Sequence, residues 1–398
     1  MLTLDKVYHA SYVLKNVIRT TDLIYAPRLS EDCQVYLKTE NLQVTGSFKI
    51  RGAYYRISQL SPEEKSKGVI ACSAGNHAQG VALAAARSGI PSLICIPDEA
   101  PIQKVEATKR YGAEVCLVNG VYDDAYRKAL ELQKERGGTF IHPFDDPDVI
   151  AGQGTIGLEL LDQLPDMDAV IVPVGGGGLI SGVAFTIKSL NPNIKVYGVQ
   201  AEGAPSMRNA LRDGRKEALP GVSTIADGIA VKRPGDLTYE LCGKYVDGIV
   251  TVSDDEISTA ILALIEDQKL IAEGAGAVAA AAVLFRKLEL TGKKVVCLIS
   301  GGNIDVTILS RVISRGLLKA GRSADLTIAL TDKPGQLLGV SRVIAELGGN
   351  VVSIHHDHAD ETVDINGCFL RIVLETRDHQ HLRQIREALV QEGYRIVN

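Results

Sequence analysis

The sequence predicts an α/β protein with two doubly wound parallel-sheet subdomains, followed by a smaller ferredoxin-like βαββαβ unit. From about residue 65, short apolar runs alternate with helical patterns. The runs are uniformly apolar, which is typical of strands covered on both faces. Near Gly321 the order changes to β-α-β-β-α-β. We therefore expect two domains, residues 1–320 and 323–398.

The repeated strand–helix units of the larger part predict parallel strands joined by right-handed crossovers. Ligands in such folds bind outside the carboxyl ends of the strands, so we expect the chemistry after Cys72, Pro173 and Ser300. The expected strands are 69–72, 92–96, 114–118, 169–173, 195–200 and 294–300, and the helices between them include 76–88, 102–111 and 121–136. In the smaller part we expect strands 326–330, 351–355, 368–374 and 394–397 and helices 334–347 and 381–391.

Composition excludes several classes of protein. The chain has 398 residues, with 45% hydrophobic and 23% charged, as in a globular protein. A net charge of −5 and the lack of Trp argue against a nucleic-acid partner. Seven cysteines without C-x-x-C predict neither a disulfide framework nor a thiolate zinc site. The longest apolar stretch is too short to span a bilayer and the N-terminus does not resemble a signal peptide, so we expect a cytoplasmic protein without a membrane partner.

The first informative segment spans residues 38–53 and reads K-T-E-N-L-Q-V-T-G-S-F-K-I-R-G-A. Ser47 is the expected N-cap of a helix, with Lys49 in its first turn. The positive end of a helix is unfavourable for a lysine and lowers the pKa of its amine. A neutral amine can form a Schiff base or act as a base, although a solvated surface lysine is the alternative.

Four glycines follow the strand 169–173 and open a helix: Gly175, Gly176, Gly177 and Gly178, then Leu179. Their backbone N–H groups can converge with the helix N-terminus to bind an anion. No Walker lysine follows, which disfavours a nucleotide P-loop, and the loop lies too late for a dinucleotide fold. A monophosphate group fits best, and a flexible turn is the alternative.

Residues 73–77 also follow a strand and open a helix. They offer a hydroxyl, an amide and free N–H groups suited to a substrate carboxylate, so Ser73, Ala74, Asn76 and His77 are candidate substrate-binding residues. Capping by Ser73 or Asn76 is the alternative. Ser300 begins a fourth loop, S-G-G-N, whose alternative is a plain turn. A lysine, two anion sites and a hydroxyl at one set of strand ends are what pyridoxal 5′-phosphate and an amino acid require.

The strings S-F-K-I-R-G-A, S-A-G-N-H-A-Q-G, G-G-G-G-L and S-G-G-N together resemble pyridoxal-phosphate enzymes of the tryptophan-synthase-β fold type, specifically the threonine/serine dehydratase family, over about residues 5–320. The resemblance implies that Lys49 forms a Schiff base with the cofactor, that Phe48 lies beside its ring and that Asn76 bonds the ring hydroxyl. It also implies that residues 175–179 hold the phosphate and that Ser300 faces the pyridine nitrogen.

A serine hydroxyl cannot keep that nitrogen protonated as an aspartate would, so prompt elimination of a β-hydroxyl is favoured over transamination. The resemblance then implies deamination of threonine to 2-oxobutanoate, or of serine to pyruvate, with Lys49 as base and Ser300 in support. Serine racemases of the family carry a serine where this chain has Ala74, which has no proton to exchange. A serine-preferring dehydratase and a catalytically inert amino-acid sensor are the alternatives.

Two acidic residues have less defined roles. Family members often bind a cation through a glutamate that matches Glu202, but the aspartate expected six residues on is Arg208 here. A divalent metal beside a guanidinium is unfavourable, which leaves a potassium-like monovalent cation held by carbonyls. Glu273 lies in an apolar segment, where it either approaches the active site or caps a helix.

The last part resembles an ACT domain, a small amino-acid-sensing module, through L-T-D-K-P-G-Q-L and L-G-G-N-V-V-S-I. The resemblance implies an amino-acid effector near Pro334, Gly335 and Asn350, allosteric control, and a homodimer or homotetramer. A module kept only for assembly is the alternative.

His355, His356, Asp357 and His358 also raise the question of a metal site. His356 and His358 share one strand face, but no third ligand is identifiable, and a polar strand is favoured.

Overall fold

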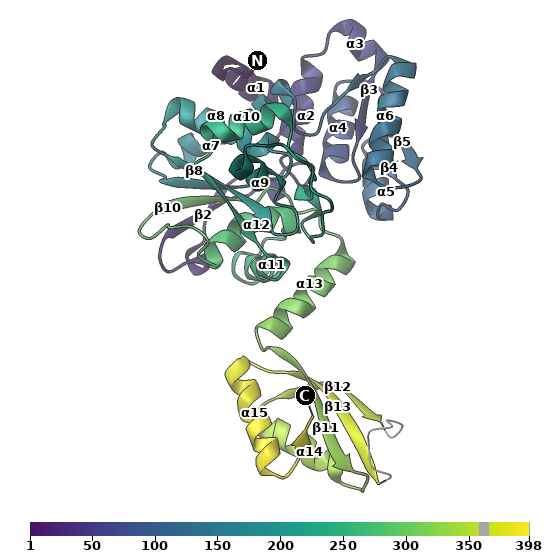
Figure 1. Ribbon diagram of the computed structural model, residues 1–398, viewed down its shortest axis with the longest axis vertical. Coiled ribbons are helices and arrows are strands. Elements are labelled where there is room, and N and C mark those ends of the chain that lie inside the picture. The colour runs from purple at the N-terminus through teal and green to yellow at the C-terminus, as the bar shows by residue number, and fades with distance from the viewer. Residues whose placement is uncertain (358–365, 398) are drawn as a thin grey trace. The chain divides into compact units, whose positions relative to one another are not determined.

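The computed structural model describes residues 1–357 and 366–397. The chain divides into two compact units, Met1–Asp305 and Val306–Asn398. The first unit contains two sheets covered by helices, and the second contains one sheet with its own helices (Figure 1). The predicted fold class, parallel-sheet subdomains followed by a ferredoxin-like unit, is confirmed. The predicted boundary at residues 320–323 stays a prediction.

The larger sheet of the first unit has six strands in the order β1-β2-β10-β7-β8-β9. All its pairs are parallel except β1 with β2. Every residue of β7 is buried, as the uniformly apolar sequence predicts. The strands are β1 Leu23–Tyr25, β2 Gln34–Lys38, β7 Ala169–Pro173, β8 Lys195–Ala201, β9 Gly248–Val252 and β10 Lys294–Leu298.

The smaller sheet has four parallel strands in the order β5-β4-β3-β6. Strand β6 was not predicted, because two residues are too short for a periodic pattern. The strands are β3 Val69–Cys72, β4 Ser92–Pro97, β5 Glu114–Val118 and β6 Thr139–Phe140.

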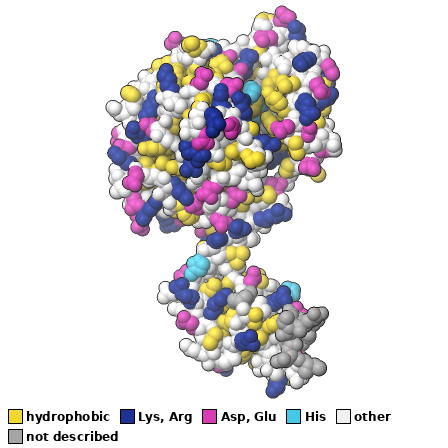
Figure 2. Space-filling view, viewed as in Figure 1, with side chains coloured by type: hydrophobic (Ala, Val, Ile, Leu, Met, Phe, Trp, Pro, Cys, Tyr) yellow, Lys and Arg dark blue, Asp and Glu magenta, His cyan; other side chains and the backbone are white. Residues whose placement is uncertain are grey.

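Helices connect these strands and cover their faces (Figure 1). They are α1 Leu4–Leu14, η1 Pro27–Leu29, η2 Glu40–Leu42, α2 Lys49–Ser58, α3 Pro62–Lys67, α4 Asn76–Arg87, α5 Ile102–Arg110, α6 Tyr122–Arg136, α7 Pro147–Gln163, α8 Gly178–Leu190, α9 Ser206–Asp213, η3 Asp227–Ile229, α10 Asp236–Tyr245, α11 Asp254–Gln268 and α12 Gly274–Leu284. Within the described ranges, no helix is long and apolar enough to cross a membrane. On the face shown in Figure 2, basic and acidic side chains are interspersed.

Helix α2 packs closely on α7. A Cβ at Gly152 of α7 would lie 2.6 Å from the carbonyl oxygen of Arg51, so a glycine is needed for this approach. The close packing fixes the position of α2, which begins with Lys49.

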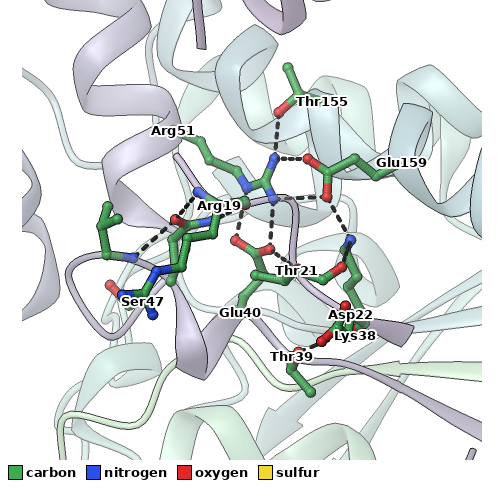
Figure 3. A network of polar contacts seen from close by, with 12 residues as sticks. Arg19, Thr21, Asp22, Lys38, Thr39, Glu40, Ser47, Arg51, Thr155 and Glu159 are labelled. Atoms are coloured by element: carbon green, nitrogen blue, oxygen red, sulfur yellow. Dashed lines mark hydrogen bonds and ion pairs between the residues drawn. The ribbon is translucent and has the colours of Figure 1, made fainter. Parts of the chain in front are cut away.

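A buried ionic network also anchors α2 (Figure 3). The Arg51 guanidinium donates to both oxygens of Glu40 at 2.7 and 2.8 Å. It also donates to both oxygens of Glu159, at 2.6 and 3.0 Å. Lys38 donates to Glu159 at 2.6 Å, and Thr21 donates to Glu40 at 2.6 Å. Two cations therefore balance two anions around the start of the helix that carries Lys49.

The second unit has an antiparallel sheet in the order β12-β13-β11-β14. Buried side chains on one face of this sheet form a core with two of the helices. The elements are α13 Val306–Lys319, β11 Ser323–Thr331, α14 Gln336–Glu346, β12 Asn350–Asp357, β13 Gly367–Glu375, α15 His379–Gln391 and β14 Arg395–Ile396. His358 of the predicted histidine strand lies outside the described residues.

Candidate active site

The loop before α2 lies against the loop after β10. The Phe48 N–H donates to the carbonyl oxygen of Ser300 at 3.1 Å. The Gly302 N–H donates to the carbonyl oxygen of Gly46 at 2.9 Å, and Ser47 forms an isolated bridge with Gly301. Two motifs that are about 250 residues apart in sequence are therefore joined by backbone hydrogen bonds.

The predicted N-cap role of Ser47 is wrong. Helix α2 begins at Lys49, Phe48 occupies the cap position, and no side chain caps the helix. The Ser47 hydroxyl is buried and has no hydrogen-bond partner in the described part of the chain. The bridge to Gly301 explains the difference, because it fixes the Ser47 backbone outside the helix.

Lys49 lies at the centre of the site. Its Nζ donates to the carbonyl oxygen of Pro143 at 2.8 Å and lies 5.4 Å from the centre of the Phe48 ring. Burial lowers the pKa of Lys49 to about 8, although the charge of Glu273 opposes the shift. A substantial fraction of this amine is therefore neutral near physiological pH.

An amide network joins three of the predicted loops. The Asn303 side chain donates to the carbonyl oxygen of Thr45 at 2.7 Å and to the side-chain oxygen of Asn76 at 2.8 Å. Asn76 in turn donates to Glu273 at 2.6 Å. These bonds orient Asn76 at the start of α4. Asn303 belongs to the S-G-G-N motif, but no role was predicted for it.

Glu273 occupies the cap position of α12, but its side chain makes no cap hydrogen bond there. The carboxyl group instead accepts the bond from Asn76. Burial, and next the charge of Asp227, raise the pKa of Glu273 to about 7. Of the two sequence interpretations, the geometry favours the one that places this carboxyl group at the site.

The glycine loop connects β7 to α8, and its backbone N–H groups are unpaired among the described residues. Among the described residues, the N–H groups of Gly175 to Leu179 donate no hydrogen bond within the protein. Gly177 has a φ of +97°, a conformation that favours glycine. Unpaired amides at a helix N-terminus are suited to an anionic group such as a phosphate.

The segment before α7, which was not predicted as part of the site, contacts both the glycine loop and Lys49. A Cβ at Gly176 would overlap the Phe144 ring, and one at Gly178 would lie 2.8 Å from the Phe144 backbone. The neighbouring Pro143 carbonyl accepts the bond from Lys49. The available signal was the string I-H-P-F after β6, a strand too short to be predicted.

The other predicted catalytic and substrate-binding residues are all buried or partly buried. The Ser300 hydroxyl is buried and donates to the Ala275 carbonyl at 3.4 Å. The Ser73 hydroxyl accepts from the Gly75 N–H at 3.1 Å, and Ala74 packs beside the core of the smaller sheet. His77 is buried with its Nε2 2.8 Å from the Ile141 carbonyl oxygen.

The charge state of His77 follows from its surroundings. Burial, and next the charge of Lys49, lower the pKa of His77 to about 3. The imidazole is therefore neutral at physiological pH.

The predicted cation and effector residues belong to other segments of the chain than the loops described above. Glu202 is exposed directly after β8, and within the described ranges it belongs to no group of three metal-ligating side chains. Gly335 has a φ of +93° at the start of α14, next to Pro334. Asn350 begins β12 and donates to Glu375 at 2.8 Å.

Comparisons with known proteins show the family to which the chain belongs. Residues 14–301 match the family described as pyridoxal-phosphate dependent enzyme, and the chain belongs to this family. It is 52% identical over 398 residues to the L-threonine ammonia-lyase of Thermotoga maritima, covering 100% of this chain and 99% of that protein.

Two solved structures are similar to most of this chain. A processed threonine deaminase isoform 2 from Solanum lycopersicum has a TM-score of 0.74 at 42% identity, over 79% of this chain and 89% of that chain. A serine racemase from maize has a TM-score of 0.75 at 35% identity, over 80% of this chain and 98% of that chain. The chain is thus an enzyme of the pyridoxal-phosphate family, and the fold predicted from the resemblance is confirmed.

Proposed function

We propose that this enzyme deaminates L-threonine to 2-oxobutanoate and ammonia, and that it also accepts L-serine. One observation carries the proposal: Lys49 has a lowered amine pKa and lies among the loops that the resemblance assigns to cofactor and substrate. The relatives named L-threonine ammonia-lyase and threonine deaminase support the choice of substrate.

The residues present fit pyridoxal 5′-phosphate. The unpaired amides of residues 175–179 would hold its phosphate, and Lys49 would hold its aldehyde carbon. Phe48 would lie beside the ring, Asn76 would donate to the ring oxygen, and Ser300 would face the ring nitrogen. When bound, this cofactor withdraws electrons from the substrate α-carbon and so acidifies the α-proton.

The protein's part in the reaction is proton transfer and orientation. Lys49 would remove the α-proton through Nζ, which its pKa near 8 allows. The Pro143 carbonyl would hold that amine in place. The uncharged Ser300 hydroxyl would leave the ring nitrogen without a stabilised proton, which favours prompt loss of the β-hydroxyl. Amides at the start of α4, near Ser73 and Ala74, would bind the substrate carboxylate.

The test is the Lys49→Ala variant of the cofactor-loaded enzyme. We expect it to lose the visible absorbance of the lysine-bound cofactor and the production of keto acid. Lys67→Ala, a change in an exposed ion pair, is the matched control and should keep both. Unchanged turnover in Lys49→Ala would contradict the proposal.

The alternatives separate in simple assays. Comparing kcat/KM for threonine and serine distinguishes a threonine dehydratase from a serine-preferring one. A catalytically inert sensor would bind an amino acid without forming keto acid. Racemisation is not proposed, because the methyl group of Ala74 cannot exchange a proton.

We also propose that the second unit binds an amino-acid effector near Pro334, Gly335 and Asn350. The support is the ferredoxin-like order of this unit and the turn at Gly335. Threonine kinetics with isoleucine, valine and AMP test regulation, and no change with any of them contradicts it. A potassium-like cation near Glu202 and a homodimer or homotetramer stay predictions.

A further inference from the structure

The second unit contains a cluster of three different metal-ligating side chains. A carboxylate oxygen of Asp332, an imidazole nitrogen of His356 and the sulfur of Cys368 all lie within 4.8 Å of one another. His356 Nε2 is 2.9 Å from Cys368 Sγ. Asp332 directly follows β11, and its N–H donates to the Asn366 carbonyl at 2.8 Å. Because β13 lies between β11 and β12, the ligands come from two adjacent strands, β12 and β13, and from the residue that directly follows the third, β11.

The strand register places these side chains on one face of the sheet. His356 lies opposite Leu370, and Leu330 lies opposite Cys368. Opposite residues share a face, and so do residues two apart along a strand. Asp332, two residues beyond Leu330, continues this face. Leu330, Leu370 and Cys368 are buried in the core, whereas Asp332 and His356 are exposed, so the cluster lies where the core meets solvent.

The donor set selects the kind of metal. Zinc takes thiolate, imidazole and carboxylate ligands at about 2.0–2.3 Å in a tetrahedron, which places neighbouring ligand atoms roughly 3.5 Å apart. A cluster within 4.8 Å needs only side-chain adjustment to reach that spacing. Magnesium and calcium prefer all-oxygen sites, so a set with sulfur and nitrogen disfavours them.

We propose that Asp332, His356 and Cys368 bind one divalent transition-metal ion, with zinc as the preferred ion and water as the fourth ligand. On binding, a metal–sulfur bond forms, the S–H bond of Cys368 breaks, and the proton passes to solvent without any redox change. The metal would tie the start of β13 to its two neighbouring strands. This site differs from the pair His356 and His358 considered from the sequence, and it needs neither His358 nor the activity proposed above.

The test uses the full cofactor-loaded chain and cobalt(II) alone as the probe. Difference spectra should show a cobalt–thiolate charge-transfer band and the visible bands of tetrahedral cobalt, saturating at one ion per chain and reversed by zinc. Cys368→Ser should remove the charge-transfer band. His356→Ala and Asp332→Asn should each weaken zinc affinity more than about tenfold.

Three matched variants serve as controls, and each should bind as the wild type does. His355→Ala and Asp325→Asn alter exposed neighbours on the same strands, and Cys33→Ser removes a partly exposed thiol of the first unit. No thiolate band in the wild type, or an equal band in Cys368→Ser, would overturn the proposal. Asp332 is exposed, so Asp332→Asn keeps the test decisive even where Cys368→Ser does not fold. At one fixed zinc concentration, zinc should also raise the Tm of the wild type more than that of Asp332→Asn.

Discussion

Replacing Arg51 by methionine should destabilise the first unit strongly. The Arg51 side chain is fully buried and makes four hydrogen bonds to carboxylate oxygens, two on Glu40 and two on Glu159. Burial alone would raise the pKa of Glu40, but the Arg51 guanidinium reverses this and holds it below the ordinary value. Methionine fills a similar volume but leaves Glu40, among the residues that the structure describes, with the Thr21 hydroxyl as its one side-chain donor.

The free energy of unfolding should fall by about 3–5 kcal/mol, which is the cost of removing one partner from a buried ion pair. Glu159 keeps Lys38, so the cost arises mainly at Glu40. At roughly 2–4 °C per kcal/mol for a large domain, the Tm should fall on the order of 10 °C. Urea unfolding followed by circular dichroism, and thermal scans at one fixed rate, measure the two quantities.

Two further variants make the measurement specific. Arg136→Met breaks an exposed bidentate pair with Glu114 and should leave the unfolding midpoint within experimental scatter. The double variant Arg51→Met with Glu40→Leu removes both buried charges and should recover much of the loss. A loss below about 1 kcal/mol in Arg51→Met alone would refute the idea that the network stabilises the Lys49 helix.

Three other changes test the site. In the cofactor-free enzyme, Glu273 has a folded pKa of about 7 against an ordinary 4.5, so the folded chain holds more protons between these values and stability falls as pH rises through them. This change should lower the free energy of unfolding by roughly 3 kcal/mol between pH 4.5 and 8. Glu273→Gln should remove the decrease, as measured by urea unfolding across this pH range, and an unaltered decrease would show that other groups cause it. Gly176→Ala should lower cofactor affinity, because the added methyl overlaps Phe144, and equal affinity in a cofactor titration would argue against this loop as the phosphate site. Ala74→Ser should gain measurable serine racemisation by chiral chromatography, and its absence would show that a hydroxyl at this position is not sufficient.

The parts of the site that follow parallel strands were predictable from sequence. The motifs that contain Gly175 and Ser300 follow β7 and β10, neighbouring strands of one parallel sheet, so topology brings them together. The motif that contains Asn76 follows β3 of the other sheet, so sheet topology alone does not bring it to them. The glycine motif is also unusual for its position, since consecutive glycines after a buried strand have a conformational cost. The structure places Asn76 in a hydrogen-bond network with the loop that begins at Ser300.

Long-range polar pairing was not predictable. Arg51 and Glu159 lie 108 residues apart, and neither stands out within its segment. A charged residue in a polar or amphipathic segment normally faces solvent, so its burial shows only once α2 and α7 are packed. The same holds for Asp332 and Cys368, because a scan for C-x-x-C spacing detects only ligands that are close in sequence.

The fold alone does not determine which reaction the enzyme catalyses, because that depends on the side chains of the site. A threonine deaminase and a serine racemase match this chain with TM-scores of 0.74 and 0.75, so the backbone does not discriminate between the two activities. Both reactions begin when a base removes the α-proton, and the base proposed above, Lys49, would serve in either. Racemisation needs a second proton donor on the opposite face of the substrate, and the resemblance implies that this donor would be the residue at position 74, an alanine here. Elimination needs no such donor, because the electrons leave with the β-hydroxyl. Under the proposed function, the alanine at position 74 would therefore limit the chemistry to elimination, although the backbone resembles that of a serine racemase as closely as that of a threonine deaminase.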